Sequence, residues 1–172
     1  PGEVNGQSYH FVSPAEFDRM VRAGEFLEWA EYAGNRYGTL KREVEAALNA
    51  GKHVLLDIEV QGARQVWSQQ LDPRPIRIFI LPPSGKGWLE RLKGRDTETP
   101  ESLRRRKQWA IGEIQQVVDV EHWEHIIVND DLEHAIAEVN QIIDESGGKQ
   151  HRPSMQRLHR LVTDLKTEAE QV

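Results

Sequence analysis

Residues 53–81, which read HVLLDIEVQGARQVWSQQLDPRPIRIFIL, predict the fold class. The stretch opens with a short apolar run that ends in an acid, Asp57, and it closes with a second apolar run, Ile76–Leu81. Between the two runs, residues 61–70 place Ala63 and Val66 at helical spacing. Two apolar strands separated by a helix predict a βαβ unit with a parallel sheet, and therefore an α/β fold.

Polar residues follow the predicted strands. A buried parallel strand presents the residue after it at the carboxyl end of the sheet, where ligands of open α/β proteins bind. Asp57 and Glu59 are therefore better site candidates than most acids in the chain. For Glu59 the alternative is a helix-start acid, which the positive end of the helix dipole favours. Further on, residues 125–128 predict another short strand, which ends at Asn129.

The amino-acid composition limits the classes of protein to which the chain can belong. The chain has 172 residues, of which 38% are hydrophobic and 29% charged, so one globular domain with appendages is expected. The net charge of -6 argues against a non-specific nucleic-acid binder. The sequence contains no cysteine and no apolar run of roughly 18 residues, so we expect a cytoplasmic protein without a membrane span. The seven histidines show no ligand-like pair, so no protein-held metal site is expected.

Residues 24–39, GEFLEWAEYAGNRYGT, combine carboxylates, aromatic rings and hydroxyls around a Gly-Asn turn. The alternation predicts strands at 26–32 and 36–38, and residues 9–12 predict a further short strand. Glu28 lies between two apolar residues, so its carboxylate would meet a ligand in a partly dry setting, where charge-assisted hydrogen bonds are about twice as strong as neutral ones. We interpret this stretch as the wall of a binding pocket.

The residues at 37–39 add to the predicted pocket. Tyr37 and Thr39 offer two hydroxyls around Gly38, whose missing side chain lets a ligand approach the backbone. A ligand with two adjacent N–H donors, such as the N1 and N2 edge of guanine, suits Glu28, whereas adenine lacks that donor pair. Tyr37 suits a phosphate oxygen, and Thr39 suits a carbonyl.

Helix boundaries follow from capping residues. Ser13 and Glu16 form a capping box, and Gly24 is placed to end the helix that they begin. Thr39 and Ser84 are each expected to cap a later helix.

A basic region between residues 88 and 107 stands out in an acidic chain. Its charge pattern predicts a basic helix, a loop and a second helix, which together would form a hinged flap. Phosphoryl transfer depends on positive groups that stabilise the charge on the transferred phosphate, so such a flap suits that reaction. For any one arginine alone, a solvated helix face is the alternative. The basic residues are Arg91, Lys93, Arg95, Arg104, Arg105, Arg106 and Lys107, of which we regard Arg104 and Arg105 as surface charges.

These motifs together resemble the guanylate kinases, the nucleoside-monophosphate kinases that phosphorylate GMP with ATP and Mg2+. Besides 24–39, the resemblance rests on PGEVNG at 1–6, YHFVS at 9–13 and DIEVQG at 57–62. It extends to about residue 146 and implies a guanylate kinase-like domain at 1–146, with a GMP-binding lobe at about 1–51 and a lid at about 84–112. The fold it implies is a three-layer P-loop-kinase-like parallel sheet with a small α+β lobe and a helical lid.

The resemblance also assigns roles to residues. It implies that Tyr9 and Tyr37 hold the GMP phosphate, that Glu28 and Thr39 select guanine beside Gly38, and that Asp57 and Glu59 lie beside GMP and its metal-bound water. The lid arginines matching Arg91, Arg95 and Arg106 would stabilise the transferred phosphate, and Asn129 would lie near the ATP adenine. For Tyr9 the alternative is an ordinary half-buried strand tyrosine, and for Asn129 a turn or cap residue.

The sequence departs from the family pattern at its beginning. In the family, a Gly-rich phosphate loop and a short arginine-bearing segment precede this point, and neither is present. Ser84-Gly85-Lys86 does not replace the loop. The loop consensus requires Gly at position 80 and Ser or Thr at position 87, where this sequence has Ile80 and Gly87. We therefore expect the first core strand to be missing and phosphate transfer to be impaired. The alternative function is a non-catalytic guanylate kinase-like interaction domain.

The chain continues past the resemblance into an extension at 147–172. An apolar stripe predicts a helix over 131–146, and a second helix follows with apolar residues in 3-4 spacing. Docking of this second helix on its own domain is the preferred interpretation, and a coiled-coil contact in a homo-oligomer is the alternative. The first stripe consists of Ala135, Ile136, Val139, Ile142 and Ile143, and the second of Met155, Leu158, Val162, Leu165 and Ala169.

Overall fold

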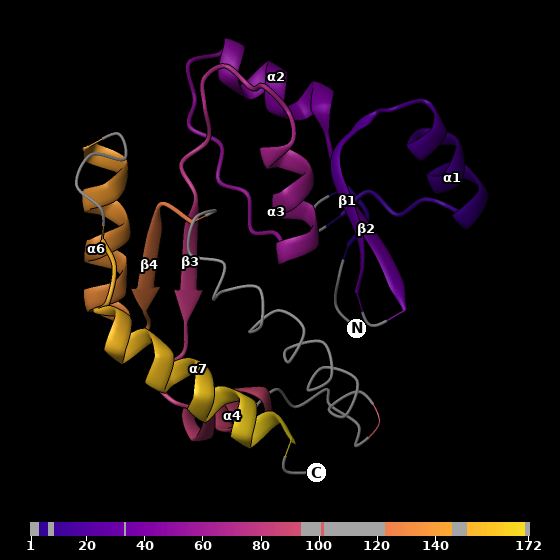
Figure 1. The fold of residues 1–172 in the computed structure, drawn as a ribbon. Helices are drawn as coiled ribbons and strands as arrows, with labels where there is room; N and C mark the ends of the chain where they lie inside the picture. The colour runs from indigo at the N-terminus through magenta and orange to yellow at the C-terminus, as the bar shows by residue number, and fades with distance from the viewer. Residues whose placement is uncertain are drawn as a thin grey trace. The chain divides into compact units, whose positions relative to one another are not determined.

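The computed structural model describes residues 4–6, 9–32, 34–93, 101, 123–145 and 151–170 (Figure 1). The chain divides into two compact units, Pro1–Gln70 and Leu71–Val172.

The first unit is built on a hairpin. Strands β1 (Phe26–Tyr32) and β2 (Asn35–Leu40) pair antiparallel, and the register places Glu28 opposite Thr39 and Ala30 opposite Tyr37. Helices α1 (Pro14–Arg22), α2 (Lys41–Asn49) and α3 (Val60–Trp67) complete this unit. The predicted strands at 26–32 and 36–38 are thus confirmed.

Helix α1 covers one face of the hairpin with an aromatic core. Phe17 stacks on Phe26 with ring centroids 4.7 Å apart, and Met20, Trp29 and Leu40 pack against the pair. The helix begins as predicted, because Ser13 Oγ accepts a hydrogen bond from the Glu16 backbone N–H at 3.2 Å. It ends before Gly24, whose φ of 66° only glycine adopts readily.

Helix α3 lies along the outer edge of β1. Gln65 accepts a hydrogen bond from the Trp29 N–H at 3.1 Å and donates to the Trp29 carbonyl at 2.6 Å. Gln69 donates to the Leu27 carbonyl at 2.7 Å. An unpaired strand edge exposes backbone donors and acceptors, and here two side-chain amides satisfy them. These bonds fix α3 relative to β1.

The second unit contains the parallel strands. Strand β3 (Ile78–Leu81) pairs in parallel with β4 (His125–Val128), and Ile78 lies opposite His125 and Leu81 opposite Val128. Helix α6 (Leu132–Asp144) packs on β4, with Ile127, Ala135 and Ile142 forming the core between them. The predicted strands at 76–81 and 125–128 are confirmed, the first over its last four residues. They pair in parallel with each other, whereas the parallel pair predicted from the sequence was 53–57 with 76–81.

The C-terminal helix belongs to this second unit. Helix α7 (Met155–Glu170) packs on α4 (Gly85–Lys93), and Asp164 accepts a hydrogen bond from the Gly85 N–H at 2.6 Å. The segment before α7 covers the edge of β4, because the His151 carbonyl accepts from the Ile126 N–H at 2.7 Å. Docking on its own domain is therefore confirmed. The buried side chains of α7 are Leu158, Leu161, Val162, Leu165 and Ala169.

The predicted strand at 53–57 is wrong, and so is the βαβ unit that it would have formed with the strand at 76–81. Residues 53–59 form no strand, and 83% of Leu55 is exposed. A strand is stable only when its backbone finds a hydrogen-bonded neighbour, and no described residue supplies one here. The short strand predicted at 9–12 is likewise reduced to a single bridge between Asn5 and Tyr9.

Two finer predictions also need correction. Thr39 does not cap α2, because Leu40 occupies the cap position and makes no side-chain bond, while the Thr39 hydroxyl bonds elsewhere. On α6, Ile136 and Ile143 are 45% and 38% exposed, so the buried stripe is narrower than predicted.

The architecture combines α and β elements as expected, with β3 and β4 as the described parallel pair. The three-layer arrangement and the missing first strand stay predictions. Of the predicted lid at 84–112, the structure describes α4 and Glu101. Within the described ranges, every helix is too short or too polar to cross a bilayer.

Candidate functional site

A buried carboxylate marks the candidate site in the first unit. Glu28, on β1, is only 5% exposed, and the Thr39 hydroxyl from β2 donates to its Oε1 at 2.6 Å. The two residues are direct cross-strand partners, so the hairpin register alone brings them together. The sequence predicted both residues for one site, and the structure joins them.

Two tyrosines adjoin this pair. Tyr37 is two residues before Thr39 on β2, so its side chain projects from the same face of the hairpin. The Tyr9 ring lies 5.5 Å from the Tyr37 ring, centroid to centroid, and Phe11 lies 6.1 Å from Tyr9. Tyr9 and Tyr37 are 47% and 41% exposed, so both rings are accessible to a ligand.

Gly38 serves the opposite face of the hairpin. A Cβ built on Gly38 would lie 2.7 Å from Phe26 Cδ1, so the missing side chain makes room for the core ring. This is a packing reason for glycine, different from the close ligand approach that the sequence suggested. A role of Gly38 beside a ligand stays a prediction.

Glu59 begins helix α3, as its alternative interpretation held. Its Oε1 accepts a hydrogen bond from the Gly62 N–H at 2.9 Å, and its side chain is the cap of the helix. Partial burial raises the pKa of the Glu59 carboxyl above its usual 4.5, with the nearby charge of Glu28 adding to the rise, while the bond from Gly62 opposes it. Glu28 and Glu59 are thus close enough to interact electrostatically.

Asp57 lies exposed in the segment before α3. It precedes the helix by three residues and so shares the helix start with Glu59. The predicted reason for its position, the end of a buried strand, does not hold. Its role as a site residue stays a prediction.

Sequence reasoning missed the residues that hold this site in place. Gln65 and Gln69 bind the backbone of β1 on either side of Glu28, at Leu27 and Trp29. Gln65 lies on α3 and Gln69 just after its end, where glutamines ordinarily face solvent. Bonds from a side chain to the backbone do not appear in hydrophobic periodicity. No signal in the sequence distinguished them.

Comparison with known proteins shows the family of the chain. The family model described as guanylate kinase matches residues 1–146. The chain belongs to the guanylate kinase family. It is 44% identical over 147 residues to the guanylate kinase of Dechloromonas aromatica, covering 86% of this chain and 70% of that protein. It is 47% identical over 139 residues to the guanylate kinase of Deinococcus radiodurans, covering 81% of this chain and 56% of that protein.

A solved structure supports the same family. The crystal structure of guanylate kinase from Anaplasma phagocytophilum superimposes with a TM-score of 0.65 at 28% identity, covering 96% of this chain and 78% of that one. The chain spans less than two thirds of several of its guanylate kinase relatives, such as 65% of the one from Symbiobacterium thermophilum.

The remaining predicted residues lie in the second unit. Arg91 is exposed on α4, and Arg95 and Arg106 lie outside the described residues. Asn129 follows β4 and donates its backbone N–H to the Leu81 carbonyl at 2.7 Å, so it stands at the carboxyl end of both parallel strands. That edge is where ligands of parallel α/β sheets bind. The lid arginines and Asn129 remain predicted site residues of this guanylate kinase family member.

Among the described residues, no three His, Asp or Glu side chains gather as a metal site. Mg2+ in phosphoryl-transfer sites is held by one or two carboxylates together with water and substrate phosphates. The exposed Asp57 and half-buried Glu59 at the start of α3 fit that kind of oxygen donor.

Proposed function

We propose that this chain binds GMP in its first unit and acts as the acceptor part of a guanylate kinase, which transfers a phosphoryl group from ATP to GMP to give ADP and GDP. The observation that carries the proposal is the buried Glu28 carboxylate, hydrogen-bonded to Thr39. The family membership supports it.

Guanine suits this pair of residues chemically. An ionised carboxylate only accepts hydrogen bonds, and its two oxygens match the adjacent N1–H and N2–H donors of guanine. When those donors occupy Glu28, the Thr39 hydroxyl can rotate and donate to the guanine carbonyl oxygen. Adenine presents an acceptor at N1, so it would leave the buried carboxylate without a partner, which costs binding free energy.

The phosphate groups would be bound by hydroxyls and cations. Tyr9 and Tyr37 have adjacent, accessible rings whose hydroxyls can donate to the GMP phosphate. Arg91, Arg95 and Arg106 would stabilise the negative charge of the transferred phosphoryl group, and Asn129 would lie near the ATP adenine. Mg2+, when bound, supplies charge neutralisation on the phosphates, and Asp57 and Glu59 would orient GMP and the metal-bound water.

The proposed partners are therefore small molecules, GMP and ATP. The net charge of -6 gives no attraction for nucleic acid. The apolar face of α7 is buried against its own unit, so it offers no support for a homo-oligomer formed through that helix. The lack of cysteine is compatible with a cytoplasmic location. The relatives compared above are named guanylate kinases, so they give no support to a non-catalytic interaction domain.

Calorimetric titration of the full chain with GMP, with AMP as the matched control, tests the proposal. We expect saturable binding of GMP and much weaker binding of AMP, because only GMP presents two donors to Glu28. Equal affinity for the two nucleotides, or binding of neither by the folded chain, would contradict the proposed function.

A further inference from the structure

The first turn of α3 packs against the carboxylate of Glu28. Gly62 is buried and is the third residue of that helix. A Cβ built on Gly62 would overlap Glu28 Oε2 and would also lie 3.2 Å from Glu28 Cδ. The Glu28 carboxylate is therefore held between two elements, with Oε1 bonded to the Thr39 hydroxyl on one side and Oε2 against Gly62 on the other.

The backbone conformation of Gly62 does not explain why glycine occupies this position. Its φ lies outside the left-handed region that favours glycine, unlike that of Gly24 or Gly51. Within a helix, glycine is less stable than alanine. What distinguishes Gly62 from alanine here is the space that a methyl group would take from the carboxylate.

The packing around Gly62 decides what would move. Gln65 and Gln69 bind the backbone of Trp29 and Leu27, so the helix cannot easily shift away from β1. The overlapping atom, by contrast, is the end of a flexible glutamate side chain. A methyl group at position 62 would therefore displace the carboxylate and leave the helix and strand in place.

We propose that Gly62 is a specificity-determining position, whose lack of a side chain holds the Glu28 carboxylate where both of its oxygens can receive the N1–H and N2–H donors of guanine. This inference rests on the proposed function and deepens it. Gly62 acts through Glu28 and is a positioning residue. Substitution of Gly62 is expected to weaken most the binding of ligands that form hydrogen bonds to both carboxylate oxygens.

The structure offers a matched control for Gly62→Ala. Gly87 is the third residue of α4, and its N–H donates to the capping side chain of Ser84 at 3.0 Å, as the Gly62 N–H donates to Glu59 at 2.9 Å. The atoms nearest to a Cβ at Gly87 would be Ser84 Oγ at 3.2 Å and two atoms of Pro83. Gly87→Ala thus makes the same chemical change at the same helical position, in the second unit.

The test compares GMP, IMP and AMP by calorimetric titration of the full wild-type chain, Gly62→Ala and Gly87→Ala. IMP keeps the N1–H donor of guanine but lacks the 2-amino group. We expect Gly62→Ala to bind GMP at least about tenfold more weakly, the loss of one charge-assisted hydrogen bond, and IMP to lose less. Gly87→Ala should bind all three nucleotides as the wild type does.

The outcomes separate the inference from the proposed function. If the wild type prefers GMP over AMP and Gly62→Ala keeps both the affinity and the preference over IMP, the inference is overturned and the function stands. If the wild type does not distinguish GMP from AMP, the proposed function fails, and the specificity role of Gly62 fails with it.

Thermal unfolding in a second background checks the contact itself. Gly62→Ala should lower the unfolding midpoint of the wild type, but it should leave unchanged or raise that of Glu28→Ala, where the clash is absent and alanine favours the helix. An equal decrease in both backgrounds would show that the added methyl group meets something other than Glu28, and it would overturn the proposal even if the single variant were too unstable to titrate.

Discussion

Glu28 is a charged side chain in a place where charge is unfavourable. Its exposed fraction is 5%, and burying an ionised carboxylate is costly unless hydrogen bonds compensate for lost water. The hydroxyl of Thr39 donates to one oxygen, while Gly62 brings no side-chain donor to the other. A ligand with paired N–H groups would complete the set.

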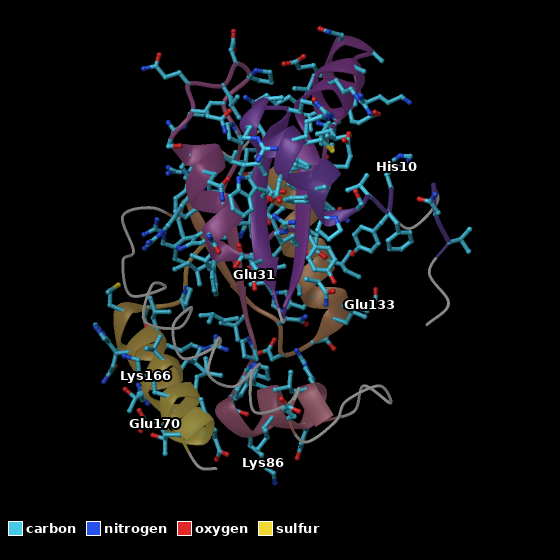
Figure 2. All side chains as sticks on the ribbon, turned by 90° about the vertical axis from the view of Figure 1, so that its right-hand side faces the viewer. His10, Glu31, Lys86, Glu133, Lys166 and Glu170 are labelled. Carbon is cyan, nitrogen blue, oxygen red and sulfur yellow. The ribbon has the colours of Figure 1, made fainter. Side chains whose placement is uncertain are left out.

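Replacing Glu28 with glutamine tests this directly. Glu28→Gln keeps the size of the side chain but replaces one acceptor oxygen by a donor, so guanine loses a charge-assisted bond worth about 1.5–3 kcal/mol. We expect GMP affinity to fall at least about tenfold in calorimetry. Glu31→Gln is the matched control, because Glu31 is exposed on the same strand (Figure 2). Unchanged GMP affinity in Glu28→Gln would remove Glu28 from the pocket.

The raised pKa of Glu59 predicts a pH dependence of stability. The folded chain holds this proton more tightly than the unfolded chain, whose carboxyl has its usual pKa of 4.5. The stabilising effect of protonation is therefore fully present below that pKa, and it is lost as the pH rises through the raised folded pKa.

Glu59→Gln mimics the protonated carboxyl at every pH. We expect its thermal unfolding midpoint to match that of the wild type at about pH 4 and to exceed it at about pH 7. Asp57→Asn, at an exposed carboxylate nearby, is the control that makes the same chemical change. A variant less stable than the wild type at neutral pH would mean that the bond from Gly62 to the ionised carboxylate outweighs its burial.

At the scale of elements, the hairpin and α3 form one assembly. The side-chain amides of Gln65 on α3 and of Gln69 just after it take the place of a neighbouring strand along β1. They satisfy the Trp29 N–H and carbonyl and the Leu27 carbonyl. The same contacts hold the first turn of α3, with Glu59 and Gly62, beside Glu28. The position of the candidate site thus depends on helix-to-strand bonds as well as on the hairpin register.

Gln65→Ala should weaken this assembly. The substitution leaves two backbone groups of Trp29 without their partner, at a cost of about 1–3 kcal/mol. Amide hydrogen exchange provides a local measurement, and we expect the Trp29 N–H to exchange faster in the variant than in the wild type. Gln61→Ala, an exposed position one turn earlier on α3, is the control. Equal exchange of Trp29 in all three proteins would show that the bond contributes nothing.

At the scale of the whole molecule, the predicted site residues are divided between two compact units. The residues predicted to bind GMP belong to the first unit. The parallel strands and α7 belong to the second. Helix α7 covers α4 with a continuous apolar face, and its outer side carries charged residues such as Lys166 and Glu170 (Figure 2). Its packing stabilises the unit that contains Arg91 and Asn129.

This division predicts that stability and GMP binding can be separated. Leu165 is 1% exposed, and Leu165→Ala should lower the free energy of unfolding of the second unit by about 2–5 kcal/mol. Denaturant unfolding measures this loss, with the exposed Glu170→Ala as control. GMP affinity, measured on the folded variant, should be unchanged. A parallel loss of GMP affinity would show that the second unit contributes to the guanine site.

Much of the fold followed from local patterns. Capping at Ser13, the stop at Gly24 and the apolar runs at β3 and β4 depend on neighbouring residues, and the structure confirms them. No strand forms at 53–57, because an apolar run favours burial but does not supply a neighbouring strand for its backbone hydrogen bonds. Thr39 was misjudged as a helix cap for a similar reason, since its hydroxyl had a better acceptor across the hairpin.

The sequence was sufficient to predict the mixed α and β content, the family resemblance, and the candidate residues Glu28, Thr39, Tyr9 and Tyr37. These follow from residue types at fixed spacing, which is local information. Only the tertiary structure decided that Gly62 lies against the Glu28 carboxylate and that Gln65 holds α3 on β1, residues that are 34 and 36 positions apart from their partners. Such contacts depend on how helices and strands pack against each other, and the residue spacing within one segment does not specify that packing.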